Sequence, residues 1–291
     1  MGVKGGGVRD GLGVSVIIPA YRAQDTIARA VSSLLVQSLS HWEAVVVSDD
    51  GTDYRAVLEA LGIADPRLTF TGTGRVGSGA PAARNAGLRV SSMPLIAPLD
   101  ADDRFEPDRL ARLVPLAAER GAAADNVAVV RDGDGSPLST LFPPGTGVAT
   151  LDAATFLATS VPMFFVVRRD AVPGWEECVD FCDDVVFNVQ VLDRVGRLPL
   201  VREPLYEYRQ RDGSITCSAD SGARADLCYR HVLDRLAGDG LRIADDSLRR
   251  RFAEALEAKR ALNAAYMAAH EAGRCANFQE FLASRENSLA G

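Results

Sequence analysis

Residues 14–53 read VSVIIPAYRAQDTIARAVSSLLVQSLSHWEAVVVSDDGTD and decide the fold of the chain. Two runs rich in β-branched residues, 14–19 and 42–49, flank a stretch at 25–37 whose apolar residues recur at helical spacing. Continuous apolar strands joined by a helix are typical of a βαβ unit, whose parallel strands are buried on both faces. We therefore expect a parallel sheet covered by helices.

The same alternation continues as far as residue 132. Strand-like runs follow at 67–72, 94–100 and 126–132. Helical patterns separate them at 54–61, 81–90 and 107–120. Strands that alternate with helices of this length favour an α/β fold, in which a mostly parallel sheet has helices on both faces.

The pattern changes from about residue 150. Strands are predicted at 161–169 and 197–211, with a helix at 184–195 between them. From about 223 to 284 the chain is helical, with breaks near 238–240 and 271–277. The sequence therefore predicts three parts: a flexible glycine-rich tail at 1–13, an α/β domain at 14–216 and a C-terminal helical extension at 217–291.

Composition excludes several classes of protein. Of the 291 residues, 47% are hydrophobic and 24% are charged, as in a globular protein and not a disordered one. The net charge of −7 gives no electrostatic attraction to nucleic acid. No apolar run approaches the roughly 18–20 residues that cross a bilayer, and no signal peptide is visible. We expect a cytoplasmic protein with reduced cysteines, with the inner face of the membrane as the alternative location.

Polar segments follow three of the predicted strands. They are PAYR at 19–22, SDDGTD at 48–53 and DADD at 100–103. Ligands of open α/β sheets bind beyond the carboxyl ends of the parallel strands, where these three segments meet. We therefore expect the functional site at this edge of the sheet.

The DADD segment places Asp100, Asp102 and Asp103 within four positions. Like charges repel and lose solvation on burial, so water, a cation or an internal arginine must compensate them. Mg²⁺ prefers oxygen ligands and commonly takes one or two carboxylates plus substrate phosphates. The pair Asp49 and Asp50 at a neighbouring strand end favours the cation, and one of that pair is suited to accept a nucleobase N–H. For Asp103 the alternative to binding a cation is that it only holds the turn.

Three further motifs each have two interpretations. GTGRVG at 72–77 matches the G-x-G-x-x-G pattern of dinucleotide-binding loops, or it is a loop that leads into the next helix. Asp183 and Asp184 begin a predicted helix, where carboxylates are favoured in general but also suit a general base. Arg209 and Arg211 form a pyrophosphate clamp or are exposed strand residues.

In this order and spacing the segments resemble the inverting glycosyltransferases of family 2, which have the GT-A fold. The resemblance covers roughly residues 13–216. It rests on residues 14–53, ARNAG at 83–87, LDADDRFEPDRL at 99–110, DD at 183–184 and YRQRDGSIT at 208–216. It implies a Rossmann-like sheet and transfer of a sugar from a nucleotide-diphosphate donor, with UDP as the expected nucleotide.

The resemblance also assigns roles to individual residues. Tyr21 would lie against the nucleobase, Asp50 would accept its ring N–H, and Asp53 would lie close to the ribose and base. Asp102, together with Asp100, would bind Mg²⁺ or Mn²⁺. The remaining donor-binding residues would be Pro19, Arg84, Asn85, Ala101, Arg209 and Arg211.

Asp184 matches the catalytic base of the family, with Asp183 as the alternative. The acceptor would be a saccharide or lipid-linked hydroxyl in polysaccharide or glycoconjugate biosynthesis. A basic run at 249–251 leaves peripheral membrane contact open, and the C-terminal helices leave a homodimer open. The alternative functions are an NAD-binding protein, a non-catalytic sugar-nucleotide-binding protein, and a nucleotidyltransferase, whose glycine-rich basic first loop this chain lacks.

Overall fold

The computed structural model describes residues 12–179, 181–211, 221–238, 240–275, 278, 280, 281 and 284. The chain divides into two compact units, Met1–Arg209 and Gln210–Gly291. The predicted boundary after residue 216 and nearly all of the predicted N-terminal tail lie outside the described residues. The predicted domain boundaries therefore stay predictions.

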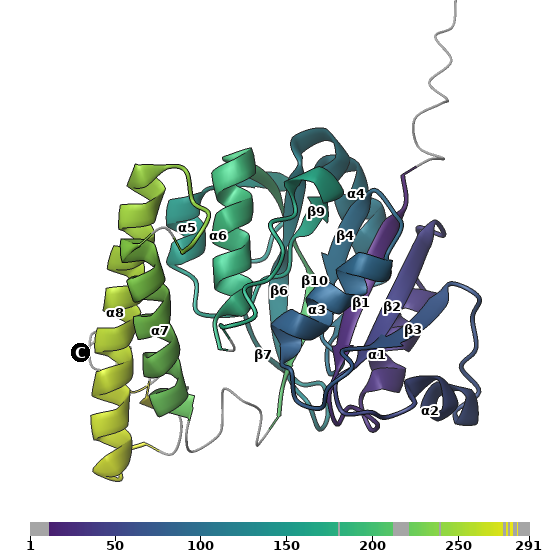
Figure 1. Ribbon diagram of the computed structural model, residues 1–291, viewed down its shortest axis with the longest axis horizontal. Helices are drawn as coiled ribbons and strands as arrows, with labels where there is room; N and C mark the ends of the chain where they lie inside the picture. Colours follow the sequence, from purple (N-terminus) through teal and green to yellow (C-terminus); the bar gives the residue numbers. More distant parts are fainter. Residues whose placement is uncertain are drawn as a thin grey trace, which may run out of the picture. The chain divides into compact units, whose positions relative to one another are not determined.

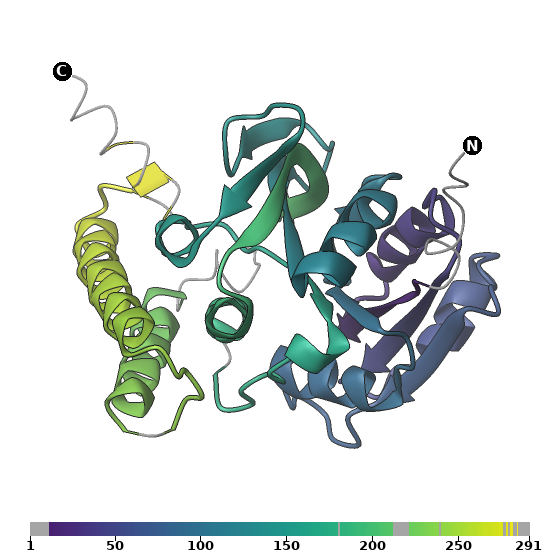
Figure 2. The same ribbon diagram turned by 90° about the horizontal axis from the view of Figure 1, so that it is seen from above.

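The first unit contains a parallel half-sheet with the strand order β3-β2-β1-β4 (Figure 1). Its strands are β1 (Val14–Ala20), β2 (Trp42–Ser48), β3 (Leu68–Gly72) and β4 (Leu95–Pro98). The helices between them are α1 (Ile27–Leu35), α2 (Tyr54–Ala60) and α3 (Ala80–Val90). Helices α1 and α3 lie on opposite sides of β1 and β2 (Figure 2), so these strands are buried on both faces, as their sequence predicts.

The sheet continues past β4 with further strands, of which β9 pairs antiparallel with both of its neighbours, β4 and β6. They are β9 (Val166–Arg168), β6 (Ala122–Arg131), β10 (Leu198–Gln210) and β5 (Arg104–Phe105), with β7 (Pro137–Thr140) beside β6 and β8 (Val148–Leu151) beside β10. The helices of this half are α4 (Arg109–Arg120), α5 (Ala153–Leu157) and α6 (Asp183–Val195). The predicted α/β class is confirmed, and strands β1–β4 pair in parallel.

The close approach of α3 to the sheet depends on Gly87. A Cβ atom at this position would lie 2.5 Å from Cγ2 of Ile17 and 3.1 Å from Cγ2 of Val47, which are side chains of β1 and β2. Only glycine permits this packing without displacing the strands. As a result α3 lies flat on the parallel strands with its N-terminus at their carboxyl edge, where Arg84 and Asn85 occupy its second turn.

One strand prediction needs correction, and three short strands were not predicted. The run at 161–169 forms only a short strand at its end, and Met163, Phe164 and Phe165 are buried without strand pairing. The apolar composition of this run indicates that its side chains are buried, but it does not indicate a strand. The small strands β5, β7 and β8 had no signal, because β5 has two residues and the other two lie mostly exposed, so they lack apolar alternation.

The second unit contains α7 (Ser221–Ala237) and α8 (Asp246–Glu271), which pack on each other. The amide of Asn263 on α8 donates to the carbonyl of Gly222 on α7 at 2.7 Å. In the parts that the structure describes, no helix has the length and apolar character needed to span a bilayer. Arg250 and Arg251 are exposed, and both membrane contact by this basic run and a homodimer stay predictions.

Candidate active site

Asp50 follows β2 and accepts four hydrogen bonds. One oxygen accepts from the backbone N–H of Arg22 at 2.6 Å and the hydroxyl of Tyr54 at 3.0 Å. The other accepts from the backbone N–H of Thr52 at 2.9 Å and the hydroxyl of Ser48 at 3.2 Å. Burial raises the pKa of Asp50, but these donors outweigh it and lower the pKa to about 2. Asp50 is therefore a firmly ionised carboxylate that joins the loops after β1 and β2.

Asp49 holds the GTGRVG loop. Its carboxylate accepts from the hydroxyl of Thr73 at 2.8 Å and from the backbone N–H groups of Ser78 at 2.9 Å and Gly79 at 2.8 Å. These N–H groups precede α3 and are the ones that a dinucleotide pyrophosphate would need. An internal carboxylate occupies them instead, which argues against the NAD-binding interpretation of this loop.

The segment after β1 presents Tyr21 to solvent, with 45% of the residue exposed. Pro19 lies in β1 and pairs with Val47 of β2, so the segment leaves the sheet beside the Asp50 loop. Arg22 has φ +51°, and among the described residues it is the one non-glycine with positive φ. Such a conformation costs about 1–3 kcal/mol and is concentrated at ligand-binding sites. This conformation brings the Arg22 N–H to Asp50, and the Arg22 guanidinium stands 5.2 Å from the centroid of the Tyr21 ring.

Asp53 caps α2, because its carboxylate accepts from the backbone N–H of Ala56 at 3.1 Å. The structure also places it in the wall of a hollow of about 200 Å³ with Ser48, Thr52 and Thr71. Capping alone explains an aspartate at this position. The predicted contact with a ribose stays a prediction.

The DADD turn follows β4, and Asp103 closes it. The Asp103 N–H donates to the carbonyl of Asp100 at 3.1 Å. Asp103 is 1% exposed, and its carboxylate accepts from the hydroxyl of Tyr206 and the backbone N–H of Arg209, both at 2.8 Å. Burial, then the charges of Asp102 and Asp100, raise the pKa of Asp103 well above its usual range. Asp103 thus anchors the turn to β10. This agrees with the sequence interpretation in which Asp103 holds the turn.

The other members of this turn are differently placed. Ala101 is buried, whereas Asp100 and Asp102 are partly exposed. The Asp102 carbonyl accepts from the guanidinium of Arg29 at 2.6 Å. The turn therefore presents two carboxylates at the edge of the sheet and withdraws the third into the core.

Arg84 joins the DADD turn to the start of α6. Arg84 is 3% exposed, and its guanidinium donates to Oδ1 of Asp100 at 2.6 Å and forms an ion pair with Asp183. Burial lowers the pKa of Arg84, but the charges of Asp183 and Asp100 outweigh it and raise the pKa. The internal arginine that the sequence left as one candidate partner for these carboxylates is therefore present. It pairs with Asp100 and Asp183 together.

Asp184 lies beside Asp183 in the first turn of α6. Burial, and next the charge of Asp183, raise the pKa of Asp184 to about 7, while Arg84 opposes the shift. The pKa of Asp183 is also raised by burial, against the opposing charge of Arg84. A carboxyl group that titrates near neutral pH is suited to accept a proton under physiological conditions.

Arg209 does not face solvent as a free strand residue. Its guanidinium forms ion pairs with Asp132, at 3.0 Å, and with Glu207, and it donates to the Asp132 carbonyl at 2.7 Å. The same Asp132 carboxylate pairs with Arg29 at 2.8 Å. Neither sequence interpretation of Arg209 included this internal network. Arg211 follows the end of β10 in the second unit, and its predicted role as a clamp stays a prediction.

The predicted metal ligands Asp100 and Asp102 fit a divalent cation by their chemistry. Two carboxylates share this turn with Asp103, and their negative charges add to burial, the larger cause, in raising the pKa of Asp103. Among the described residues, no group of three or more His, Cys, Asp or Glu side chains is gathered for a metal. A cation held here would therefore complete its shell with water and the phosphates of a substrate, as Mg²⁺ commonly does.

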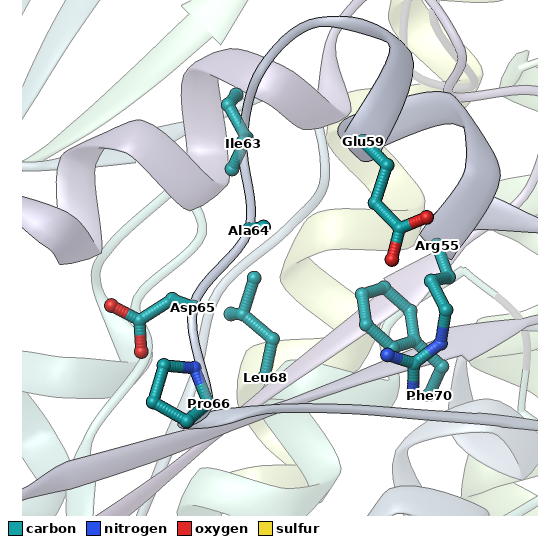
Figure 3. Close-up of a pocket in the computed structure, with 8 residues that line it drawn as sticks. All are labelled: Arg55, Glu59, Ile63, Ala64, Asp65, Pro66, Leu68 and Phe70. Atoms are coloured by element: carbon teal, nitrogen blue, oxygen red, sulfur yellow. The ribbon is translucent and has the colours of Figure 1, made fainter.

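A separate pocket is lined by residues of α2, the following loop and β3, and none of the predicted site residues lines it (Figure 3). Its volume is about 240 Å³. The Arg55 guanidinium stands over the Phe70 ring at 4.5 Å within it. The lining comes from α2, the following loop and β3: Arg55, Glu59, Ile63, Ala64, Asp65, Pro66, Leu68 and Phe70. The edge of the sheet with converging carboxylates remains the better candidate site.

Comparisons with known proteins agree with this geometry. Residues 15–195 match the family "Glycosyl transferase family 2". The succinoglycan biosynthesis protein ExoO of Rhizobium meliloti (strain 1021) is 41% identical over 249 residues, which are 77% of this chain and 70% of that protein. The UDP-Glc:alpha-D-GlcNAc-diphosphoundecaprenol beta-1,3-glucosyltransferase WfgD of Escherichia coli is 37% identical over 97 residues, which are 33% of this chain and 38% of that protein.

Solved structures give the same picture of the fold. The crystal structure of S. aureus TarS 1-349 in complex with UDP-GlcNAc has a TM-score of 0.61 at 17% sequence identity. The match covers 87% of this chain and 72% of that chain. At this identity the likeness establishes a shared fold.

Proposed function

The chain belongs to glycosyl transferase family 2, and from this premise we propose that it transfers a hexosyl group from a UDP-sugar to an acceptor hydroxyl with inversion. The acceptor is a saccharide or a lipid-linked saccharide in the synthesis of a polysaccharide or glycoconjugate. Two relatives support this proposal, since one is a succinoglycan biosynthesis protein and the other is a glucosyltransferase named for UDP-Glc and a diphosphoundecaprenol-linked acceptor.

The ion pair between Arg84 and Asp183 is the observation on which the mechanism rests. An acceptor hydroxyl is a weak nucleophile until a carboxylate takes its proton in the transition state. Because Asp183 is tied to Arg84, we assign the base to Asp184, whose pKa of about 7 suits the task. The acceptor oxygen bonds to the anomeric carbon, the bond from that carbon to the diphosphate breaks, and Asp184 receives the proton. Attack opposite the leaving group inverts the anomeric centre.

The donor is bound at the loops after β1, β2 and β4. Tyr21 offers an exposed ring for the nucleobase, and Asp50 offers an ionised acceptor for its ring N–H. Asp100 and Asp102 would hold Mg²⁺ or Mn²⁺, which neutralises charge on the departing diphosphate when bound. The other donor-binding residues of the proposal are Pro19, Asp53, Arg84, Ala101, Arg209 and Arg211.

A panel of nucleotide sugars tests the proposal. Each donor is offered with Mn²⁺, and both donor cleavage and the thermal shift of the protein are measured. We expect UDP-sugars to stabilise the protein and to be cleaved, and Asp102→Ala to abolish the metal-dependent turnover. Stabilisation by NAD and not by UDP with Mn²⁺ would overturn the proposal. Unchanged turnover in the presence of a chelator would overturn the proposed role of the metal.

A further inference from the structure

Asn85, next to Arg84 on α3, is bound to the segment that precedes α6. Its side-chain amide nitrogen donates to the carbonyl of Trp175 at 2.8 Å and to Oε1 of Glu177 at 2.9 Å. Its amide oxygen accepts from the N–H of Trp175 at 2.9 Å. One amide group therefore pairs with both backbone polar groups of a residue 90 positions away in the chain.

Trp175 continues this connection into α6. Its ring stacks on the ring of Phe187, with centroids 4.2 Å apart and planes 8° from parallel. Both side chains are buried. Phe187 stands three residues after Asp184 in α6, and residues at this spacing are neighbours on one side of a helix. The stack therefore constrains the rotation of the first turns of α6 about the helix axis.

These contacts differ from the predicted donor-binding role of Asn85. An amide side chain has two N–H donors, and here both are used within the protein. The contacts connect α3 with the helix that carries Asp183 and Asp184. Arg84 and Asn85 thus hold the start of α6 at two points, one by an ion pair and one through Trp175.

We propose that Asn85 is a positioning residue that sets the place of Asp184 through Trp175 and Phe187. The proposal rests on the proposed function, because Asp184 acts there as the base. Catalysis is sensitive to such placement: a displacement of about 1 Å can cost on the order of 100-fold in rate. Donor binding at the loops after β1, β2 and β4 does not depend on this connection.

The test compares Asn85→Ala with a matched variant, Asn126→Ala. Asn126 in β6 makes the corresponding pair of hydrogen bonds with Phe142, donating to its carbonyl at 2.8 Å and accepting from its N–H at 2.9 Å. Its further hydrogen bonds are with Arg202 and Val127, which lie outside α6. We expect Asn85→Ala to lower kcat for transfer by roughly 10- to 100-fold with an unchanged donor KM and UDP affinity. We expect Asn126→Ala to lower thermal stability without this kinetic split.

Phe187→Leu supplies a second and independent variant, because it removes the stack and keeps an apolar side chain. If both residues act in one connection, the double variant Asn85→Ala/Phe187→Leu loses no more kcat than the worse single variant. Losses that multiply would overturn the proposal. A raised donor KM with unchanged kcat in Asn85→Ala would also overturn it and return Asn85 to the donor site.

Hydrogen exchange separates failure of this proposal from failure of the proposed function. In the unliganded protein, Asn85→Ala should speed the exchange of the backbone amides of 186–190, and Asn126→Ala should leave them unchanged. This result would support the positioning role even for a wild-type protein that transfers no sugar. Equal exchange in the two variants would contradict it, whatever the activity.

Discussion

Two aspartates of the candidate site, Asp50 and Asp184, have opposite surroundings. Asp50 lies at a loop and accepts four hydrogen bonds, and its pKa falls to about 2. Asp184 lies at a buried helix start beside Asp183, and its pKa rises to about 7. The same side chain is thus a permanent anion in one place and a group that titrates at neutral pH in the other.

The two pKa values differ because hydrogen-bond donors dominate at Asp50 and burial dominates at Asp184. N–H and O–H groups aimed at a carboxylate stabilise its charged form, as at Asp50. Burial next to a like charge destabilises that form, as at Asp184, and the positive charge of Arg84 only moderates the effect. The loops after β1 and β2 are therefore suited to hold a ligand by a fixed charge, and the start of α6 is suited to move a proton.

The largest effect is expected from Asp184→Asn. The amide cannot take the acceptor proton, so transfer should fall by about 10²–10⁴-fold while UDP affinity stays nearly unchanged. In the wild-type protein kcat should rise with pH through about 7, as Asp184 loses its proton. Steady-state kinetics over pH 5–9 and calorimetric UDP binding measure both quantities. A collapse of UDP affinity would instead place Asp184 in the donor site.

Asp184→Asn should also change stability in a direction set by linkage. The folded pKa lies above the ordinary value of 3.8, so the folded state binds more protons than the unfolded state between these values. The wild-type protein therefore loses stability through this group as pH rises from about 4 to 7. The Asn variant should gain Tm relative to wild type at pH 8 and show little gain at pH 4. An equal gain at both pH values would contradict the raised pKa.

Arg84→Met should cost about 3–5 kcal/mol in the free energy of unfolding, because it leaves Asp100 and Asp183 without their shared partner. It should also move the midpoint of the kcat–pH profile above 7, since Arg84 lowers the pKa of Asp184. Denaturant unfolding and the pH profile measure the two effects. Arg67→Met is a control, because its partner Asp65 forms a more exposed pair at 2.8 Å. Similar losses of unfolding free energy in both variants would mean that the buried ion pairs of Arg84 stabilise the protein no more than the exposed pair of Arg67.

The sequence predicted the positions of these groups better than their partners. The βαβ pattern located the edge of the sheet, and Asp50 and Asp100 lie in the segments after β2 and β4 that it indicated. Asp184 lies at a helix start that the sequence predicted separately. The bond from Arg84 to Asp183 joins residues 99 positions apart. Periodicity and capping rules describe neighbours in sequence, so they cannot identify such a pair. They likewise gave no sign that Tyr206 would hold Asp103.

Asp50→Asn tests the other side of the comparison. The amide retains the shape but loses the charge, and one of its two ends no longer accepts from its N–H and O–H partners. We expect a loss of about 1–3 kcal/mol in stability at pH 7. Since the folded pKa is depressed, the wild-type advantage is present above the ordinary value of 3.8 and is lost as pH falls toward 2. Denaturant unfolding at pH 7, 4 and 2 checks this, and a constant difference across these values would contradict it.

The smallest effect separates capping from ligand binding at Asp53. Asp53→Ala should cost about 1 kcal/mol in stability, because the N-terminus of α2 loses its cap. Asp152 caps α5 in the same way, accepting from the N–H of Thr155 at 2.9 Å, so Asp152→Ala should cost a similar amount. If Asp53 also bonds the donor, only its variant should raise the donor KM, by roughly 3- to 10-fold for one hydrogen bond. Equal KM values in the two variants would leave Asp53 a helix cap, and the hollow beside Ser48 and Thr71 would then have no part in donor binding.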